Sequence, residues 1–192
     1  MSDASSALPD GYTVVSFSMS GAIHPGGENL TFNGTLPNIF AQIQSIKPDF
    51  AWDDFQPATN PTREEEGKDP SECLRLEIIC NIPNVASGNR WYALSGYDYL
   101  KMIDQPCAID GGPRKCVVLF CFDGTTIWLC NDNEQRISYS CAYLADYVLD
   151  LIGDLDCSDA DGSPTPHWTE MQGQAFDSSN YNIIIGKDDC PP

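Results

Sequence analysis

The chain has 192 residues, and its ten basic and 28 acidic side chains give a formal net charge of -18. This charge opposes the counterion release that drives binding to nucleic acid or anionic lipid, so both are excluded as main partners. No run of about 18 apolar residues occurs, so no membrane-spanning helix is predicted.

Residues 1–55 are predicted to form a ββα unit. Apolar and polar side chains alternate over Tyr12–Met19, as in a half-buried strand, and a second strand over residues 30–33 would complete a hairpin. Thr35 stands where a helix N-cap belongs, and Pro48 would end that helix. A unit of about 40 residues is too small to be stable alone, so it is expected to dock on the rest of the chain or on another chain.

Residues 56–72 combine prolines with an acidic run, the composition of an exposed linker. Cleavage there would make residues 1–55 a propeptide, but Arg63 is not part of a dibasic pair, so the segment is expected to stay attached. Asn29 and Asn33 each begin a glycosylation sequon, which is compatible with a secreted glycoprotein.

Residues 73–192 show a second pattern of strands and helices. The predicted elements are a strand over 74–80, a helix over 91–103 capped by Asn89 or Ser87, a hairpin of strands 116–122 and 126–130 turning at Asp123-Gly124, a helix over 140–151 and a strand over 181–186. This order predicts an α+β domain in which two helices pack on a small antiparallel sheet.

All nine cysteines lie between Cys73 and Cys190, six of them between Cys107 and Cys157. Irregular spacings of this density are typical of disulfides formed in an oxidising compartment. The chain has no CxxC pair and only two histidines, so the ligand spacing of a structural zinc site is missing. Secretion is therefore expected. Because the first residues lack the basic and apolar regions of a signal peptide, a signal is expected to have been removed.

The cysteines of the predicted hairpin depend on its register. Cys116 and Cys121 are five residues apart, so alternation places them on opposite faces of the strand. A two-residue turn would put Cys130 on the face of Cys121, whereas a three-residue turn would put it on the face of Cys116. The alternation alone leaves both registers open.

Five segments carry a family resemblance: CAIDGGPRKC, VVLFC, IWLCNDN, SCAYLADYVLDLIGDLDC and MQGQAFDSSNYNIIIGKDDC. Across residues 73–190 the chain resembles secreted fungal cysteine-rich proteins related to the virally encoded smut killer toxin of the killer-protein-four type. The resemblance implies a killer-toxin-like sandwich, preceded here by the additional ββα unit. It also implies four disulfides and an unpaired, free thiol at Cys73. The implied pairs are Cys80–Cys157, Cys107–Cys141, Cys116–Cys130 and Cys121–Cys190.

One departure from the family concerns the hairpin. The toxin resembles a basic calcium-channel blocker with a lysine close before the cysteine that matches Cys121, whereas this chain has Leu119 and Phe120 there, and Lys115 is the nearest cation. The resemblance therefore implies a toxin-like scaffold without a cation at this place.

No residue pattern points to a catalytic, cofactor or metal site. His24 lies in a Gly/Pro turn and His167 in a Pro-rich loop, and neither has a Ser or Cys partner at a recognisable spacing. The acidic residues from Asp154 to Asp161 suggest calcium, but the loop register would put Cys157 and Trp168 at ligand positions. No metal is therefore expected.

These observations predict a secreted fungal effector or toxin-like virulence protein that is not an enzyme. It would act as a monomer by binding an unknown protein or glycan on the surface of a host or competitor cell. Two alternatives remain open. One is a cell-wall or glycan-binding structural protein without toxicity, and the other is a secreted hydrolase using clustered carboxylates such as Asp98, Asp104 or Asp110.

Overall fold

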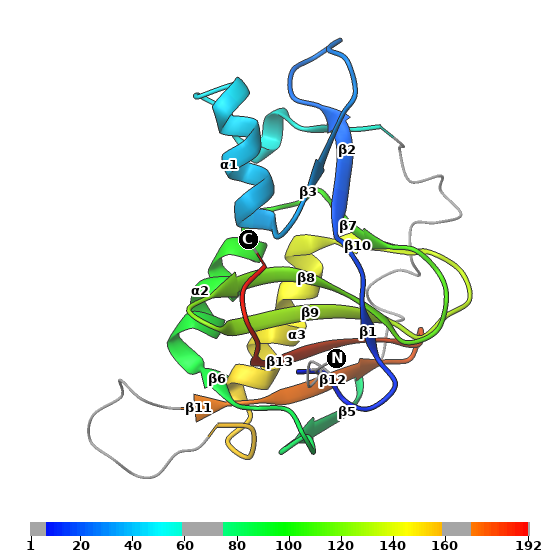
Figure 1. The fold of residues 1–192 in the computed structure, drawn as a ribbon, viewed down its shortest axis with the longest axis vertical. Coiled ribbons are helices and arrows are strands. Elements are labelled where there is room, and N and C mark those ends of the chain that lie inside the picture. Colours follow the sequence, from blue (N-terminus) through cyan, green and yellow to red (C-terminus); the bar gives the residue numbers. More distant parts are fainter. Residues whose placement is uncertain (1–6, 59–74, 159–169, 192) are drawn as a thin grey trace, which may run out of the picture.

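The computed structural model describes residues 7–58, 75–158 and 170–191. In these ranges the chain forms three α-helices and several small sheets, in which nearly all neighbouring strands are antiparallel (Figure 1). The α+β class predicted from the sequence is confirmed.

The largest sheet has six strands in the order β1-β8-β9-β13-β12-β5. Its central strands β9 and β13 are buried on both faces except at Lys187, which explains their nearly continuous apolar sequences. Every neighbouring pair is antiparallel except β1 and β8, which are parallel. The bounds are β1 Thr13–Val14, β5 Arg75–Cys80, β8 Lys115–Phe122, β9 Thr125–Asn131, β12 Gly173–Asp177 and β13 Tyr181–Lys187.

Two helices contribute to the same apolar cluster as one face of this sheet. They are α2 (Arg90–Lys101) and α3 (Cys141–Gly153). Asn89, one of the two predicted caps of α2, accepts from Trp91 N, and the side chain of Ser140 accepts from Tyr143 N at the start of α3. Leu100 of α2, Val148 of α3 and Ile127 of β9 are all fully buried in this cluster. Two short strand pairs flank it: β7 (Pro106–Ile109) with β10 (Ile137–Ser140), and β6 (Gly88–Asn89) with β11 (Glu170–Met171).

The N-terminal unit contains the predicted hairpin and helix, together with a third strand that the sequence pattern did not indicate. Its elements are β2 (Ser18–Ala22), β3 (Leu30–Asn33), α1 (Leu36–Ile46), the 3-10 helix η1 (Trp52–Asp54) and β4 (Gln56–Pro57). Thr35 caps α1 as predicted. Because β4 pairs with β2, Gln56 and Pro57, which were expected in the linker over 56–72, belong to the unit. Residues 59–72 of that expected linker lie outside the described residues.

The single strand predicted over Tyr12–Met19 is instead two strands in different sheets. β1 pairs with β8 in the large sheet, and β2 pairs with β3 in the N-terminal unit. Residues 15–17 form the connecting segment between β1 and β2 and hydrogen-bond to both parts of the structure. Val15 N donates to Cys116 O of the large sheet over 2.8 Å, and Gly34 N of the N-terminal unit donates to Phe17 O over 3.0 Å. The alternating pattern hides the break because Phe17, which lies between the two strands, is still buried.

A bulge in β8 overturns the prediction that Cys116 and Cys121 lie on opposite faces. The turn has two residues, Asp123 and Gly124, with φ of 46° and 80°, and Phe122 pairs with Thr125. The register then shifts between Val118 and Phe120, so that Cys116 faces Cys130. The extra residue reverses the alternation, and both hairpin cysteines pack on the face turned away from α2 and α3.

Four disulfides join the described cysteines, and they are the same pairs that the resemblance implies. They connect Cys80 with Cys157, Cys107 with Cys141, Cys116 with Cys130 and Cys121 with Cys190. Their sequence separations run from 14 to 77 residues, for which the loop-entropy model gives about 3 to 4.5 kcal/mol each. Cys73 lies outside the described residues.

Candidate binding site at the junction of the two sheets

The N-terminal unit and the large sheet share one apolar core. Ile39 and Trp52 of the unit belong to the same buried cluster as Leu100, Ile103 and Phe120. Polar contacts cross the same boundary: the Tyr99 hydroxyl donates to Leu36 O over 3.5 Å. The unit is therefore packed on the rest of the chain as an integral part of the structure.

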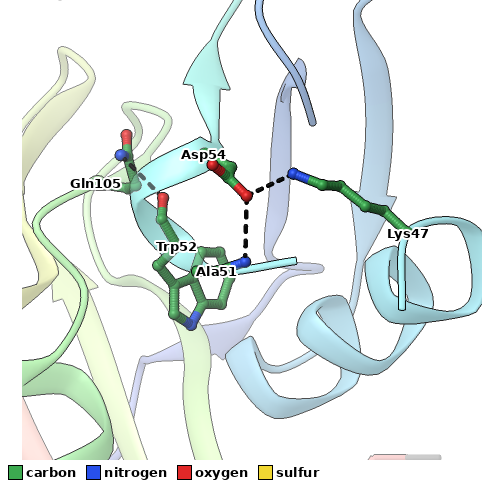
Figure 2. A network of polar contacts seen from close by, with 5 residues as sticks. All are labelled: Lys47, Ala51, Trp52, Asp54 and Gln105. Atoms are coloured by element: carbon green, nitrogen blue, oxygen red, sulfur yellow. Dashed lines mark hydrogen bonds and ion pairs between the residues drawn. The ribbon is translucent and has the colours of Figure 1, made fainter. Parts of the chain in front are cut away.

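A polar network fixes η1 at this boundary (Figure 2). Lys47 at the end of α1 forms an ion pair with Asp54, whose carboxylate also accepts from Ala51 N over 3.5 Å. The hydrogen bond from Lys47, with that from Ala51, holds the pKa of the Asp54 carboxyl below its usual value. From the other side, the Gln105 side chain donates to Trp52 O over 3.3 Å, so η1 is held by both α1 and the segment after α2.

The first cavity at the junction has a volume of about 320 Å³, and we call it the apolar cleft. Its lining includes the apolar residues Val14, Phe17 and Val118 and the acidic residues Asp188 and Asp189. In Figure 1 the C-terminal tail rises across β8 and β9 toward the start of α1. The cleft thus combines the connecting segment, the N-terminal unit and the tail.

Two contacts fix the tail wall of the apolar cleft. Asp188 N donates to Gly124 O over 2.8 Å, and the Cys121–Cys190 disulfide ties the tail to β8. The acidic side chains are therefore held at the cleft in a chain that is already strongly acidic. A partner group with an apolar body and a positive charge would complement this surface.

The second cavity lies beside the same connecting segment and shares Val15 and Ser16 with the first. Its volume is about 210 Å³, and we call it the polar cavity. Ser16, Ser18, Asp110, Lys115 and Arg136 line it, and they come from three separate parts of the chain. Here two cations of an acidic protein face one small space.

A buried tyrosine network lies away from both cavities. The Tyr147 hydroxyl donates to Asp177 Oδ2 over 2.5 Å and accepts from the Tyr181 hydroxyl over 2.9 Å. The Tyr143 and Tyr147 hydroxyl oxygens are 3.0 Å apart. Burial, strengthened by these hydrogen bonds, raises the pKa of both Tyr147 and Tyr181. Because Tyr147, Tyr181 and Asp177 are enclosed, we assign the network to holding α3 on the sheet.

A second polar network lies beneath the N-terminal residues. Asn182 is fully buried, and its amide donates to the Tyr12 hydroxyl over 3.1 Å and to Asp132 Oδ2 over 2.8 Å. The Tyr12 hydroxyl itself donates to Asp132 over 3.1 Å. Burial, followed by the charge of Asp132, raises the pKa of Tyr12 to about 12. The Tyr12 hydroxyl therefore supplies hydrogen bonds to Asn182 and Asp132 that water would otherwise have to provide.

The residues singled out from the sequence are scattered. His24 is exposed in its turn, and the two sequon residues Asn29 and Asn33 are exposed as well, while His167 lies outside the described residues. Asp98 and Asp104 are exposed and line neither of the two cavities, whereas Asp110 lines the polar cavity.

Of the acidic residues after α3, Asp154 and Asp156 lie in the described part of the chain. Asp154 lies close to Cys80 and Cys157. The two sulfurs are joined as a disulfide, so they offer no thiolate to a metal. Asp159 and Asp161 lie outside the described residues.

Both cavities were missed in the sequence reading. Their walls come from residues near positions 16, 110, 136 and 189, which no local motif connects. The one available signal was the cation Lys115 directly before a hairpin cysteine, and this position does line the polar cavity.

No protein-family model, curated protein or solved structure matches the chain. No helix in the described ranges is long and apolar enough to cross a membrane. The resemblance of residues 73–190 to killer-toxin-like proteins therefore stays a prediction from the sequence motifs.

Proposed function

We propose that the protein is a secreted fungal effector or toxin-like protein that binds a surface target on a host or competitor cell without catalysing a reaction. The observation that carries the proposal is the apolar cleft, because ligand sites form preferentially where two structural units meet. The four disulfides are compatible with an extracellular protein.

The cleft defines the chemistry of the target. Val14 is half exposed, and with Phe17 and Val118 it offers an apolar surface next to the carboxylates of Asp188 and Asp189. A lysine or arginine side chain on a target protein has both an aliphatic stem and a positive head. We therefore expect the cleft to take a basic side chain of a surface protein, with its stem on the valines.

We also propose that the cysteine-rich part of the chain has the fold of the killer-toxin-like proteins. Helices α2 and α3 contribute to one apolar cluster with the large sheet, and the four cysteine pairs coincide with those that the resemblance implies. These two features support a killer-toxin-like sandwich extended by an N-terminal unit.

The test is binding of the oxidised protein to intact plant cells and yeast, measured by flow cytometry together with cell death or growth arrest. Exchanging Asp188 and Asp189 for Asn should weaken binding by about two- to thirtyfold, since each exposed ion pair contributes about 0.2 to 1 kcal/mol. The control variant carries Asp98→Asn and Asp104→Asn, the same change of charge on exposed residues outside the cleft.

Two results would refute this function. Equal loss in both variants would mean that only net charge is recognised. A protein that binds no cell surface and causes neither death nor arrest would not be an effector of this kind.

The second candidate is a cell-wall or glycan-binding protein without toxicity, and the polar cavity favours it. Its hydroxyl, carboxylate and cationic side chains are the groups that bind sugars through hydrogen bonds. Binding to an isolated wall preparation without any effect on cell growth would support this candidate over the first.

A further inference from the structure

We infer that the polar cavity binds a small hydroxylated carboxylate, with the chemistry of a single uronic acid residue. This inference deepens the second candidate function, glycan binding at the polar cavity, and it stands or falls separately from binding at the apolar cleft.

The first step is that the ammonium of Lys115 in this cavity has no carboxylate partner among the described residues, and Arg136 has only a long, exposed contact with Asp110. The Lys115 ammonium donates to Gly111 O over 2.8 Å, and within the described ranges no carboxylate lies in ion-pair distance of it. By contrast, Lys47 and Lys101 each contact an aspartate. With 28 acidic residues in the chain, cations that stay available at a cavity are suited to bind an external anion.

The second step concerns Arg136. Its Nε lies 3.7 Å from Asp110 Oδ1, beyond hydrogen-bond distance, and the Asp110 side chain is 90% exposed. Such a pair contributes little and leaves the guanidinium free to turn toward a ligand. A planar guanidinium matches a carboxylate with two parallel hydrogen bonds, and the nearby ammonium adds a point charge.

The third step distinguishes a sugar acid from a bare anion. Asp110 lines the same cavity as the two cations, so a phosphate dianion would meet a repulsive carboxylate there. A sugar hydroxyl would instead donate to that carboxylate. Ser16 and Ser18 add two hydroxyls that form no hydrogen bond with another described residue. The lining therefore offers one place for a negative charge and several for hydroxyl groups.

The size of the cavity sets the length of the ligand. At about 210 Å³ it is smaller than the 300 to 1,000 Å³ typical of sites for drug-sized molecules. We therefore expect one ring to be enclosed, with any remaining chain outside. Ser16 and Ser18 come from the segment that leads into the N-terminal unit, whereas Lys115 begins β8. A bound ring would thus bridge the two parts of the protein.

The test is titration calorimetry on the full oxidised chain with glucuronate, glucose, acetate and sulfate. Glucuronate should bind in a saturable way, and glucose and acetate should bind at least about tenfold more weakly because each lacks one set of the required groups. Lys115→Gln and Arg136→Gln should each weaken glucuronate binding about tenfold or more, the loss expected for a hydrogen bond to a charged group. The affinity of Arg136→Lys for glucuronate should lie between that of the two Gln variants and that of the unchanged protein.

The matched control is Lys101→Gln, which removes the same charge from an ammonium already held by Asp146. It should leave glucuronate binding unchanged, and thermal melting should show that all variants are folded. Absence of saturable glucuronate binding, equal binding of acetate or sulfate, or equal weakening by Lys101→Gln would each overturn the inference. The Asp188 and Asp189 variants test the cleft alone, so a failure there would leave this result untouched.

Discussion

Gly96→Ala tests how tightly α2 packs on the large sheet. A Cβ atom at position 96 would lie 2.4 Å from Ile127 Cδ1 and 2.8 Å from Phe120 Cδ1. Ile127 is fully buried and Phe120 is 6% exposed, so neither can move into solvent. Overpacking of this kind costs about 1 to 3 kcal/mol. The better helix propensity of alanine returns about 1 kcal/mol, so we expect a net loss of about 1 kcal/mol in the free energy of unfolding.

The assay is urea unfolding of the oxidised protein followed by far-ultraviolet circular dichroism. For a chain of this size, a loss of about 1 kcal/mol lowers the melting temperature by about 2 to 4 °C. Gly153→Ala is the matched control. Gly153 is the last residue of α3, and no atom lies within 4 Å of a Cβ added at this position. This control should be neutral or stabilised by up to about 1 kcal/mol. If Gly96→Ala were as stable as Gly153→Ala, α2 would not lie against β8 and β9 as described.

Two further predictions concern the tyrosine networks. Tyr147→Phe should lower the free energy of unfolding by about 1 to 3 kcal/mol, measured by urea titration, because it removes the donor to the enclosed Asp177 Oδ2 and the acceptor of the buried Tyr181 hydroxyl; a loss no larger than that of Tyr143→Phe would contradict this. Because folding raises the pKa of Tyr12 from 10.0 to about 12, its stabilising contribution is complete below pH 10 and is lost as the pH rises through 12. Urea titrations between pH 10 and 12 should show that the free energy of unfolding falls less with pH in Tyr12→Phe than in the unchanged protein. The same pH dependence in both proteins would refute the raised pKa of Tyr12.

The features predicted correctly are those coded within a few neighbouring residues. Thr35 caps α1 and Asn89 caps α2 because a short polar side chain can bond the free amides of the first turn. Asp123-Gly124 forms the hairpin turn because both residues tolerate a positive φ. These signals need no knowledge of the rest of the chain.

The features that were missed depend on distant partners. The bulge between Val118 and Phe120 leaves no mark in an apolar run, yet it decides which face Cys121 occupies. The division of residues 12–19 between two sheets follows from pairing with β8, which begins at Lys115. Both cavities form only when these distant segments meet, so neither could be found from spacing within the sequence.

The parallel pairing of β1 with β8 has a consequence for the order of events during synthesis. Thr13 pairs with Lys115, which is made about 100 residues later, and at about 5 to 20 residues per second this is a delay of roughly 5 to 20 seconds. The growing chain must therefore carry Val14 and its neighbours unpaired until the β8–β9 hairpin exists. The acceptor for Val15 N is the carbonyl of Cys116, whose sulfur is bonded to Cys130. This edge of the large sheet can therefore form only after β8 has been made.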